Sequence, residues 1–333
     1  MKKAIFTIFA IAIALGTGFS VSYFAVSGVR FALQKSGGVI SSLVSSFSLR
    51  SLASTGEVIE NIVQEKTEEA QGEIISAPVP MELVQEKPRE TDSDKLAKIT
   101  ADSYLVADLE SGDILLAKNS SAVRPIASIS KLMTALVSFS RMDQADIATV
   151  SSRALDTRET AGGLVLNEKI SVGDLLFPLL LESSNDAAEV IAEHFGRANF
   201  IAEMNTTAKS LGMKNTSFSD PSGLSNQNVS TAQDLFLFVR DLYLSRSEVF
   251  TITRQDRYQV LGHRWVNASL FVNEEGYLGG KSGYIYAAGH TLISLFNFKT
   301  SRGDRRIAFI TLKGDNKEAD MRLLIGHVIN SLR

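Results

Sequence analysis

Apolar residues recur at the spacing of an α-helix through the middle of the chain and again at its C-terminal end. Leu132, Leu136 and Phe139 lie on one apolar stripe, which predicts a helix over residues 131–139. Capping residues and closing glycines indicate further helices at residues 172–181, 185–195, 199–211 and 231–243. Apolar residues spaced three and four apart predict an amphipathic helix over residues 321–332.

Strand-like segments lie on both sides of this helical block. Residues 104–109 and 113–118 flank the turn Glu110-Ser111-Gly112 and predict a hairpin. Further strands are predicted at residues 258–261, 292–297 and 306–312. Strands at both ends of a helical block indicate an α+β fold, in which one antiparallel sheet is built from both ends of the domain and covered by helices.

The N-terminus has the pattern of an export or anchoring segment. Lys2 and Lys3 precede an uncharged stretch, residues 4–29, which is long enough to cross about 30 Å of hydrocarbon as a helix. Lysines before such a stretch favour an orientation with the N-terminus inside. We therefore predict an exported protein of the cell envelope, anchored to the cytoplasmic membrane by residues 1–29. A cleaved signal peptide is the alternative, because the most apolar part, residues 4–15, is short.

Composition separates the rest of the chain into two parts. Residues 30–97 are rich in Ser, Gly, Glu, Gln and Lys, which predicts a disordered tether, and residues 98–333 form the predicted folded domain. The formal net charge of −3 provides no basic field for nucleic acid. The absence of cysteine excludes disulfides, thiolate metal sites and a cysteine nucleophile.

Ser128 and Lys131 are the first candidates for catalysis. They lie three residues apart at the start of the predicted helix, so their side chains share one face. A serine hydroxyl needs a neighbouring base to become a nucleophile, and a buried lysine can be neutral enough to be that base. The N-terminus of the helix adds backbone N–H groups where an oxyanion would form. In isolation, however, this spacing is more typical of a capping serine followed by a surface lysine.

Two other stretches contain residues that can complete a site. The break between the second and third predicted helices can present Ser183 and Asn185, although a capped helix connection would look the same. The glycine-rich stretch around Lys281 and Ser282 precedes a strand-like segment. Its glycines let the backbone approach a ligand closely, and Lys281 can bind a carboxylate. The four histidines show no metal-binding spacing, so no metal site is predicted.

Taken in order, Ser128-x-x-Lys131, Ser183-x-Asn185 and Lys281-Ser282-Gly283 resemble the three motifs of the penicillin-recognising serine enzymes. The flanking residues are similar to those of the D-alanyl-D-alanine carboxypeptidase family, over roughly residues 100–333. The matching flanks include Pro125-Ile126-Ala127-Ser128-Ile129-Ser130-Lys131-Leu132-Met133-Thr134, Asp220-Pro221-Ser222-Gly223-Leu224 and Ala288-Gly289-His290.

This resemblance implies a β-lactamase/transpeptidase-like fold with the active site between the sheet and the helices. It implies a serine D,D-carboxypeptidase that removes the terminal D-Ala from peptidoglycan stem peptides through an acyl-serine intermediate. β-Lactams would act as covalent inhibitors, and no cofactor is implied.

The resemblance also implies a role for each candidate residue. Ser128 would be the nucleophile, Lys131 the base, Ser183 a proton relay and Asn185 the group that orients Lys131. The backbone N–H groups of Ser128 and Tyr284 would form the oxyanion hole. The substrate carboxylate would be bound by Lys281, Ser282 and Arg306, beside Gly283 and Tyr284.

Departures from the family pattern are small. Ser130 and Ser282 replace threonines, and Ser184 stands where Gly or Ala is common. Ile285 replaces a residue that often carries a hydroxyl, which affects the prediction of fine substrate contacts.

Three alternative functions remain. A D,D-endopeptidase that cuts peptidoglycan cross-links would use the same residues. A β-lactamase would need a base for fast deacylation, and the chain has no Glu-x-x-Leu-Asn stretch to supply it. A non-enzymatic envelope-binding protein would lack catalytic residues that are present here.

Overall fold

A five-stranded antiparallel sheet joins the two ends of the domain. The computed structural model describes residues 96–159, 161–301 and 303–332. Its main strands are β1 (Ser103–Asp108), β2 (Ile114–Lys118), β9 (Tyr277–Ile285), β10 (Gly289–Thr300) and β11 (Gly303–Gly314), in the order β2-β1-β11-β10-β9. β1 pairs with β11 from Ser103 opposite Leu312 to Asp108 opposite Ile307. The prediction of one antiparallel sheet built from both ends is therefore confirmed.

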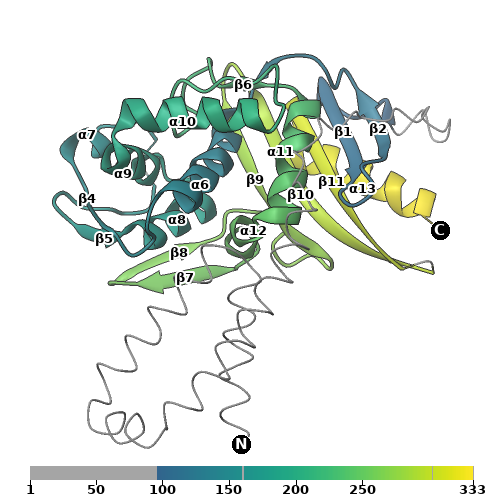
Figure 1. The fold of residues 1–333 in the computed structure, drawn as a ribbon. Coiled ribbons are helices and arrows are strands. Elements are labelled where there is room, and N and C mark those ends of the chain that lie inside the picture. Colours follow the sequence, from purple (N-terminus) through teal and green to yellow (C-terminus); the bar gives the residue numbers. More distant parts are fainter. Residues whose placement is uncertain (1–95, 160, 302, 333) are drawn as a thin grey trace, which may run out of the picture. The chain divides into compact units, whose positions relative to one another are not determined.

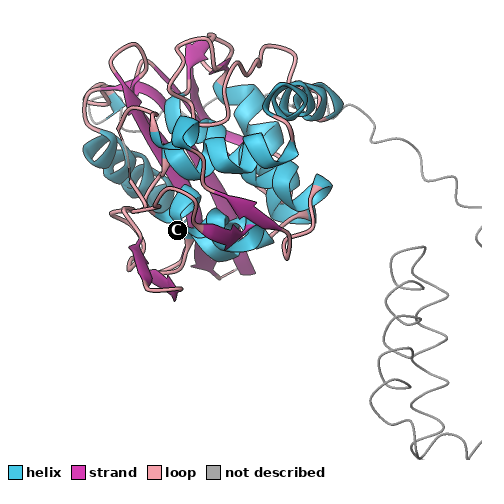
Figure 2. Ribbon diagram, turned by 90° about the vertical axis from the view of Figure 1, so that its left-hand side faces the viewer, coloured by secondary structure: helices cyan, strands magenta, loops and turns pink. Residues whose placement is uncertain are grey.

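Each face of this sheet is covered by helices, because its strands are apolar on both sides. On one face, residues such as Leu105, Ile293 and Ile310 belong to the large core shared with the helical block. On the other face, Val106 and Phe309 belong to a second core, shared with helix α13 (Lys317–Leu332). Figure 1 shows α13 and the block on opposite sides of the strands, and Figure 2 views the molecule from the side of the block.

The helical block carries the candidates Lys131 and Asn185. Its helices are α6 (Ser130–Arg141), α8 (Val172–Leu181), α9 (Asn185–Phe195), α10 (Arg197–Ser210), α11 (Ala232–Ser245) and the short α12 (Glu248–Thr253). The prediction was accurate for α8 and α9, whose bounds match the predicted residues. A serine caps each helix in the structure: Ser171 Oγ accepts from Asp174 N, as the sequence signature indicated, and Ser184 Oγ accepts from Ala187 N.

Shorter elements surround the block. They are the 3₁₀ helix η1 (Ala127–Ile129), the helix α7 (Ser152–Leu155), and the paired strands β3 (Arg124–Pro125) with β6 (Val229–Ser230), β4 (Ile147–Thr149) with β5 (Lys169–Ser171) and β7 (Arg257–Val260) with β8 (His263–Val266).

The glycine-rich stretch around Lys281 differs from the sequence-based expectation. The sequence suggested that it precedes a strand, whereas it lies inside β9, an edge strand of the main sheet. Its glycines are required by close packing, since a Cβ on Gly280 would lie 2.2 Å from the carbonyl oxygen of Ile293. Glycine in this strand therefore reflects tight contact between backbones.

The N-terminal predictions lie outside the described residues. These are the anchor or signal segment, residues 1–29, and the tether, residues 30–97, except for its last two positions. Within the described ranges, none of the helices combines the length and apolar character that a membrane crossing requires.

Candidate active site

Ser128 lies in η1, directly before the first turn of α6. It is half-buried, while its neighbours Ala127 and Ile129 are buried in the protein. Ala127 adopts a φ of 48°, in the left-handed region that non-glycine residues seldom occupy. Such strain is often found at functional sites, and here it precedes the predicted nucleophile.

Lys131 is fully buried and surrounded by oxygen atoms. Its Nζ donates to Ser128 Oγ at 2.9 Å, to Asn185 Oδ1 at 2.7 Å and to the carbonyl oxygen of Ser222 at 2.6 Å. Burial lowers the pKa of Lys131 from 10.5 to about 7, against the opposing effect of the carboxylates of Asp220 and Glu159. A substantial fraction of this lysine is therefore neutral near pH 7.

Asn185 is held in place by hydrogen bonds on the side of its amide that faces away from Lys131. It is the first residue of α9, and its Nδ2 donates to the carbonyl oxygens of Arg158 and Glu159 at 2.9 Å and 3.1 Å. With both amide hydrogens used, its Oδ1 is directed at Lys131. Ser183 lies in the same connection between α8 and α9, with a φ of 63°.

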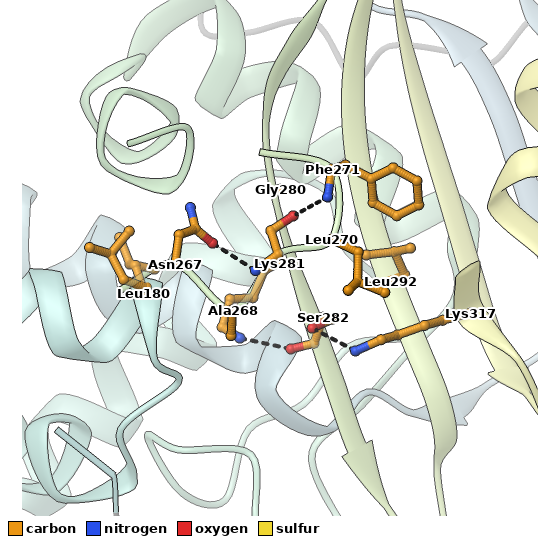
Figure 3. A pocket seen from close by; sticks show the side chains of 12 residues that line it. Leu180, Asn267, Ala268, Leu270, Phe271, Gly280, Lys281, Ser282, Leu292 and Lys317 are labelled. Atoms are coloured by element: carbon orange, nitrogen blue, oxygen red, sulfur yellow. Dashed lines mark hydrogen bonds between the residues drawn. The ribbon is translucent and has the colours of Figure 1, made fainter. Parts of the chain in front are cut away.

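β9 brings a second buried lysine to the site. The Nζ of Lys281 donates to the carbonyl oxygen of Ser282 at 2.7 Å (Figure 3). Burial, together with the positive charges of Lys131 and Lys317, holds the pKa of Lys281 well below 10.5. The site therefore contains two desolvated amines, one on each side.

Gly283 and Tyr284 follow Lys281 on β9 and lie beside Ser128. A Cβ on Gly283 would come within 2.6 Å of Ser128 N, so only glycine fits there without displacement. The N–H of Gly280 donates to Thr253 Oγ1, on the side of β9 that faces away from β10. Because alternate residues of a strand direct their N–H groups to the same side, the N–H of Tyr284 also faces this free edge. Two backbone donors, at Ser128 and Tyr284, thus lie near one another.

Arg306 is not brought to these residues. On the sheet Ser282 lies opposite Leu292, which lies opposite Thr311, whereas Arg306 is five positions further along β11, roughly 17 Å at the rise of a strand. Its Nη1 instead donates to Glu110 Oε1 at 2.5 Å.

Lys317, which the sequence analysis did not identify, lies beside Ser282 instead. Its Nζ donates to Ser282 Oγ at 3.3 Å, and burial lowers the pKa of Lys317 (Figure 3). It is the first residue of α13, where an acidic residue would suit the helix dipole better. The predicted helix began only at residue 321, so the sequence did not indicate that Lys317 stands at the start of a helix.

Lys281, Ser282 and Lys317 line a small cavity of about 20 Å³, together with Leu270 and Ala268. Such a volume holds about one water molecule or one small polar group. Two amines that converge on so small a space favour an anion. Within the residues that the structure describes, no group of three or more His, Asp or Glu side chains is arranged to hold a metal ion.

Comparison with known proteins agrees with this geometry. A family model described as D-alanyl-D-alanine carboxypeptidase matches residues 89–316. The chain is 32% identical over 233 residues to a D-alanyl-D-alanine endopeptidase of Escherichia coli (strain K12), covering 66% of this chain and 73% of that protein. It is 31% identical to the D-alanyl-D-alanine carboxypeptidase DacB2 of Mycobacterium tuberculosis, covering 66% of this chain and 76% of that protein. The chain belongs to the D-alanyl-D-alanine carboxypeptidase family.

Solved structures support the same assignment. A D-alanyl-D-alanine carboxypeptidase from Mycobacterium tuberculosis H37Rv superposes with a TM-score of 0.64 at 27% identity, covering 71% of this chain and 93% of that one. Penicillin-binding protein D2 from Listeria monocytogenes, solved with bound cefotaxime, gives a TM-score of 0.61 at 28% identity, covering 72% and 97%. The predicted family, fold class and enzyme class are thus confirmed: this family member is a serine-type D-alanyl-D-alanine peptidase.

Proposed function

We propose that this chain is a serine D,D-carboxypeptidase that removes the terminal D-Ala from peptidoglycan stem peptides, with Ser128 as its nucleophile. The observation that carries the proposal is the 2.9 Å contact between Ser128 Oγ and Lys131 Nζ, in a lysine whose pKa is about 7. A neutral Lys131 accepts the hydroxyl proton while Ser128 Oγ forms a bond to the carbonyl carbon of the scissile peptide. The tetrahedral oxyanion is stabilised by the N–H groups of Ser128 and Tyr284, each worth about 3 kcal/mol in comparable sites.

Collapse of the tetrahedral intermediate breaks the C–N bond. The leaving amine takes a proton from Lys131 through the hydroxyl of Ser183, which leaves an acyl-serine and a free D-Ala. Water then attacks the ester carbonyl while Lys131 accepts one of the water's protons. The bond between the carbonyl carbon and Ser128 Oγ breaks, and Lys131 returns the proton to Ser128 Oγ, so that the free hydroxyl and the neutral lysine are restored. Asn185 keeps Lys131 in position during both half-reactions, as its contact at 2.7 Å supports.

The substrate carboxylate is bound at Lys281, Ser282 and Lys317 in this proposal, with Gly283 allowing the peptide to approach. Two amines at a small cavity favour this assignment. Arg306, which the sequence analysis placed in this role, is distant along β11 and paired with Glu110, so we do not include it.

A D,D-endopeptidase acting on peptidoglycan cross-links is the second candidate. Two relatives at 32% and 34% identity, from Escherichia coli and Pseudomonas aeruginosa, are named D-alanyl-D-alanine endopeptidases. The same catalytic residues serve both reactions. Incubation with a pentapeptide muropeptide and with a purified cross-linked dimer, followed by chromatography, distinguishes the two: free D-Ala identifies a carboxypeptidase, and monomers from the dimer identify an endopeptidase.

We further propose that the protein acts in the cell envelope, anchored to the cytoplasmic membrane by residues 1–29. The uncharged stretch that follows Lys2 and Lys3 supports this. N-terminal sequencing of the mature protein from a membrane fraction would test it. Retention of Met1 or Lys2 supports an anchor, and a new N-terminus after residue 15 would identify a cleaved signal peptide.

The catalytic proposal is tested by intact-mass analysis of the full-length protein after incubation with benzylpenicillin. We expect one covalent adduct on the wild type and none on Ser128→Ala. Ser138→Ala, which removes a buried hydroxyl elsewhere on α6, is the matched control and should retain the adduct. An adduct that persists on Ser128→Ala would refute the nucleophile assignment.

A further inference from the structure

The loop at residues 219–228 supplies one of the three oxygens around Lys131, although it contains none of the three recognised motifs. The carbonyl oxygen of Ser222 accepts from Lys131 Nζ at 2.6 Å, the shortest of the three contacts. A neutral amine has two hydrogens and one lone pair. If Asn185 Oδ1 and Ser222 O take the two hydrogens, the lone pair is left facing the hydroxyl of Ser128.

Asp220 folds this loop around its own carboxylate. Its Oδ1 accepts from Ser222 N, Ser222 Oγ and Gly223 N, and its Oδ2 accepts from Ser225 N at 2.7 Å. These bonds fix the peptide units on both sides of Ser222. Asp220 is itself buried, at 8% exposure, so its hydrogen bonds and charge are little screened by solvent.

The folded loop is also fastened to helix α6. Asn228 Nδ2 donates to Ser130 Oγ at 3.0 Å, and Thr134 Oγ1 donates to the carbonyl oxygen of Pro221 at 2.6 Å. Gly223 adopts a φ of 89°, and a Cβ there would lie 2.0 Å from the carbonyl oxygen of Ala127. The loop therefore has little freedom to move relative to the helix that carries Lys131.

We propose that Asp220 is a positioning residue for the catalytic lysine, because its carboxylate holds the Ser222 carbonyl against Lys131 and places a negative charge behind it. This inference rests on the proposed function of Ser128 and Lys131. It assigns two effects to one carboxylate. The hydrogen bonds set the direction of the lysine lone pair, and the charge sets the pH at which the lone pair becomes available.

Other charges near Lys131 must be separated from the effect of Asp220. The carboxylates of Asp220 and Glu159 both favour the charged amine of Lys131. The positive charges of Lys131 and Lys281 repel one another, and this repulsion lowers the pKa of Lys281. Glu159 is exposed, and solvent screens it more than it screens Asp220. Removing the charge of Asp220 should therefore lower the pKa of Lys131 below about 7, and neutral lysine would persist to lower pH.

The experiment measures the second-order rate of acylation by benzylpenicillin from pH 5 to pH 9, on the full-length protein. We expect the wild-type rate to rise with a midpoint near pH 7. In Asp220→Asn the midpoint should move to lower pH and the plateau should fall at least about tenfold, as the loss of one well-placed hydrogen bond to a charged group implies. In Asp220→Glu, which keeps the charge but displaces the turn, the plateau should fall while the midpoint stays.

Asp256→Asn is the matched control, since Asp256 is half-exposed and pairs with Arg257 on the β7–β8 hairpin. Its profile should superimpose on that of the wild type. A lower plateau in Asp220→Asn with an unmoved midpoint would mean a purely structural role and would overturn the proposal. If Asp220→Asn does not fold, Asp220→Glu decides, because a wild-type plateau in that variant overturns the positioning role.

The failure of this inference can be distinguished from the failure of the proposed function. A wild type that forms no adduct refutes both. A wild type that is acylated, together with an unmoved midpoint in Asp220→Asn, refutes only the role of Asp220.

Discussion

The two buried lysines of the site, Lys131 and Lys281, have different surroundings. On the helical side, Lys131 Nζ contacts three oxygens, and two of them are fixed by further hydrogen bonds. On the β9 side, the Nζ of Lys281 donates, among the described residues, only to the carbonyl oxygen of Ser282. The charges that act on it are those of two other amines, Lys131 and Lys317. Lys131 therefore has its hydrogen-bond partners without a substrate, whereas Lys281 has no anion beside it among the described residues.

This difference explains why two lysines of similar burial suit different tasks. Nearby carboxylates limit how far burial lowers the pKa of Lys131, which leaves it near 7 and able both to accept and to return a proton. Nearby cations lower the pKa of Lys281 further. A substrate carboxylate would reverse that effect and favour the charged form of Lys281. Binding of the carboxylate would therefore promote protonation of Lys281, and the protonated lysine would in turn bind the carboxylate more strongly.

The largest expected effect comes from replacing Lys131, the buried lysine on the helical side of the site. Lys131→Met keeps the length of the side chain but removes the base, and general-base catalysis is typically worth about 10²–10⁴-fold in rate. We expect the acylation rate with benzylpenicillin at pH 8 to fall by about 10³-fold, as measured by stopped-flow quenching or mass spectrometry. Lys209→Met, an exposed lysine on α10, should leave the rate unchanged. A loss smaller than about tenfold in Lys131→Met would indicate that another group is the base.

The same variant should change how stability depends on pH. Folding lowers the pKa of Lys131 from 10.5 to about 7, so between these values the unfolded chain holds a proton that the folded chain does not. Raising the pH through this window therefore stabilises the folded state, by at most about 1.4 kcal/mol per pH unit, and this contribution is lost as pH falls toward 7. Urea unfolding at pH 7, 8 and 9 should show that the free energy of unfolding of the wild type rises with pH relative to that of Lys131→Met. A constant difference would contradict the buried, neutral lysine.

The third expected effect, a loss of kcat/KM on replacing Lys317, should depend on the charge at the C-terminus of the substrate. Lys317→Ala removes an amine at Ser282, and a hydrogen bond to a charged group is worth about 1.5–3 kcal/mol, or roughly 10- to 100-fold in kcat/KM. We expect this loss with a peptide that ends in a free carboxylate and almost none with its C-terminal amide. Arg306→Ala is the matched control, because Arg306 is paired with Glu110, and it should change kcat/KM less than twofold. The reverse ranking would restore Arg306 as the carboxylate ligand.

The helical side was the more predictable from sequence. Ser128 and Lys131 lie three residues apart where a helix was predicted to begin, and Asn185 lies at the predicted break between two helices, so local rules indicated where all three stand. The contact of Lys131 with Asn185 required only that two apolar helices pack together. Their chemical roles stay predictions until the variants are measured.

The β9 side depends on register across strands, which local rules do not contain. Arg306 and Lys317 follow one another closely in the sequence, yet one lies far along β11 and the other lies at Ser282. The carbonyl of Ser222 was unpredictable for another reason, since any residue has a carbonyl and only the folded loop shows which one is used. Glycines in β9 obscured the strand because they usually mark turns.

The pairing of β1 with β11 has a consequence for how the enzyme acquires activity. A chain that emerges from its N-terminus produces β1 and the Ser128 helix well before β9 and β11, the partner of β1. Sheets that join distant parts of a chain form slowly, because the intervening loop must be closed first. Maturation of the active site is therefore a late event, and an unfinished chain presents its serine and lysine with neither an oxyanion hole nor a carboxylate pocket.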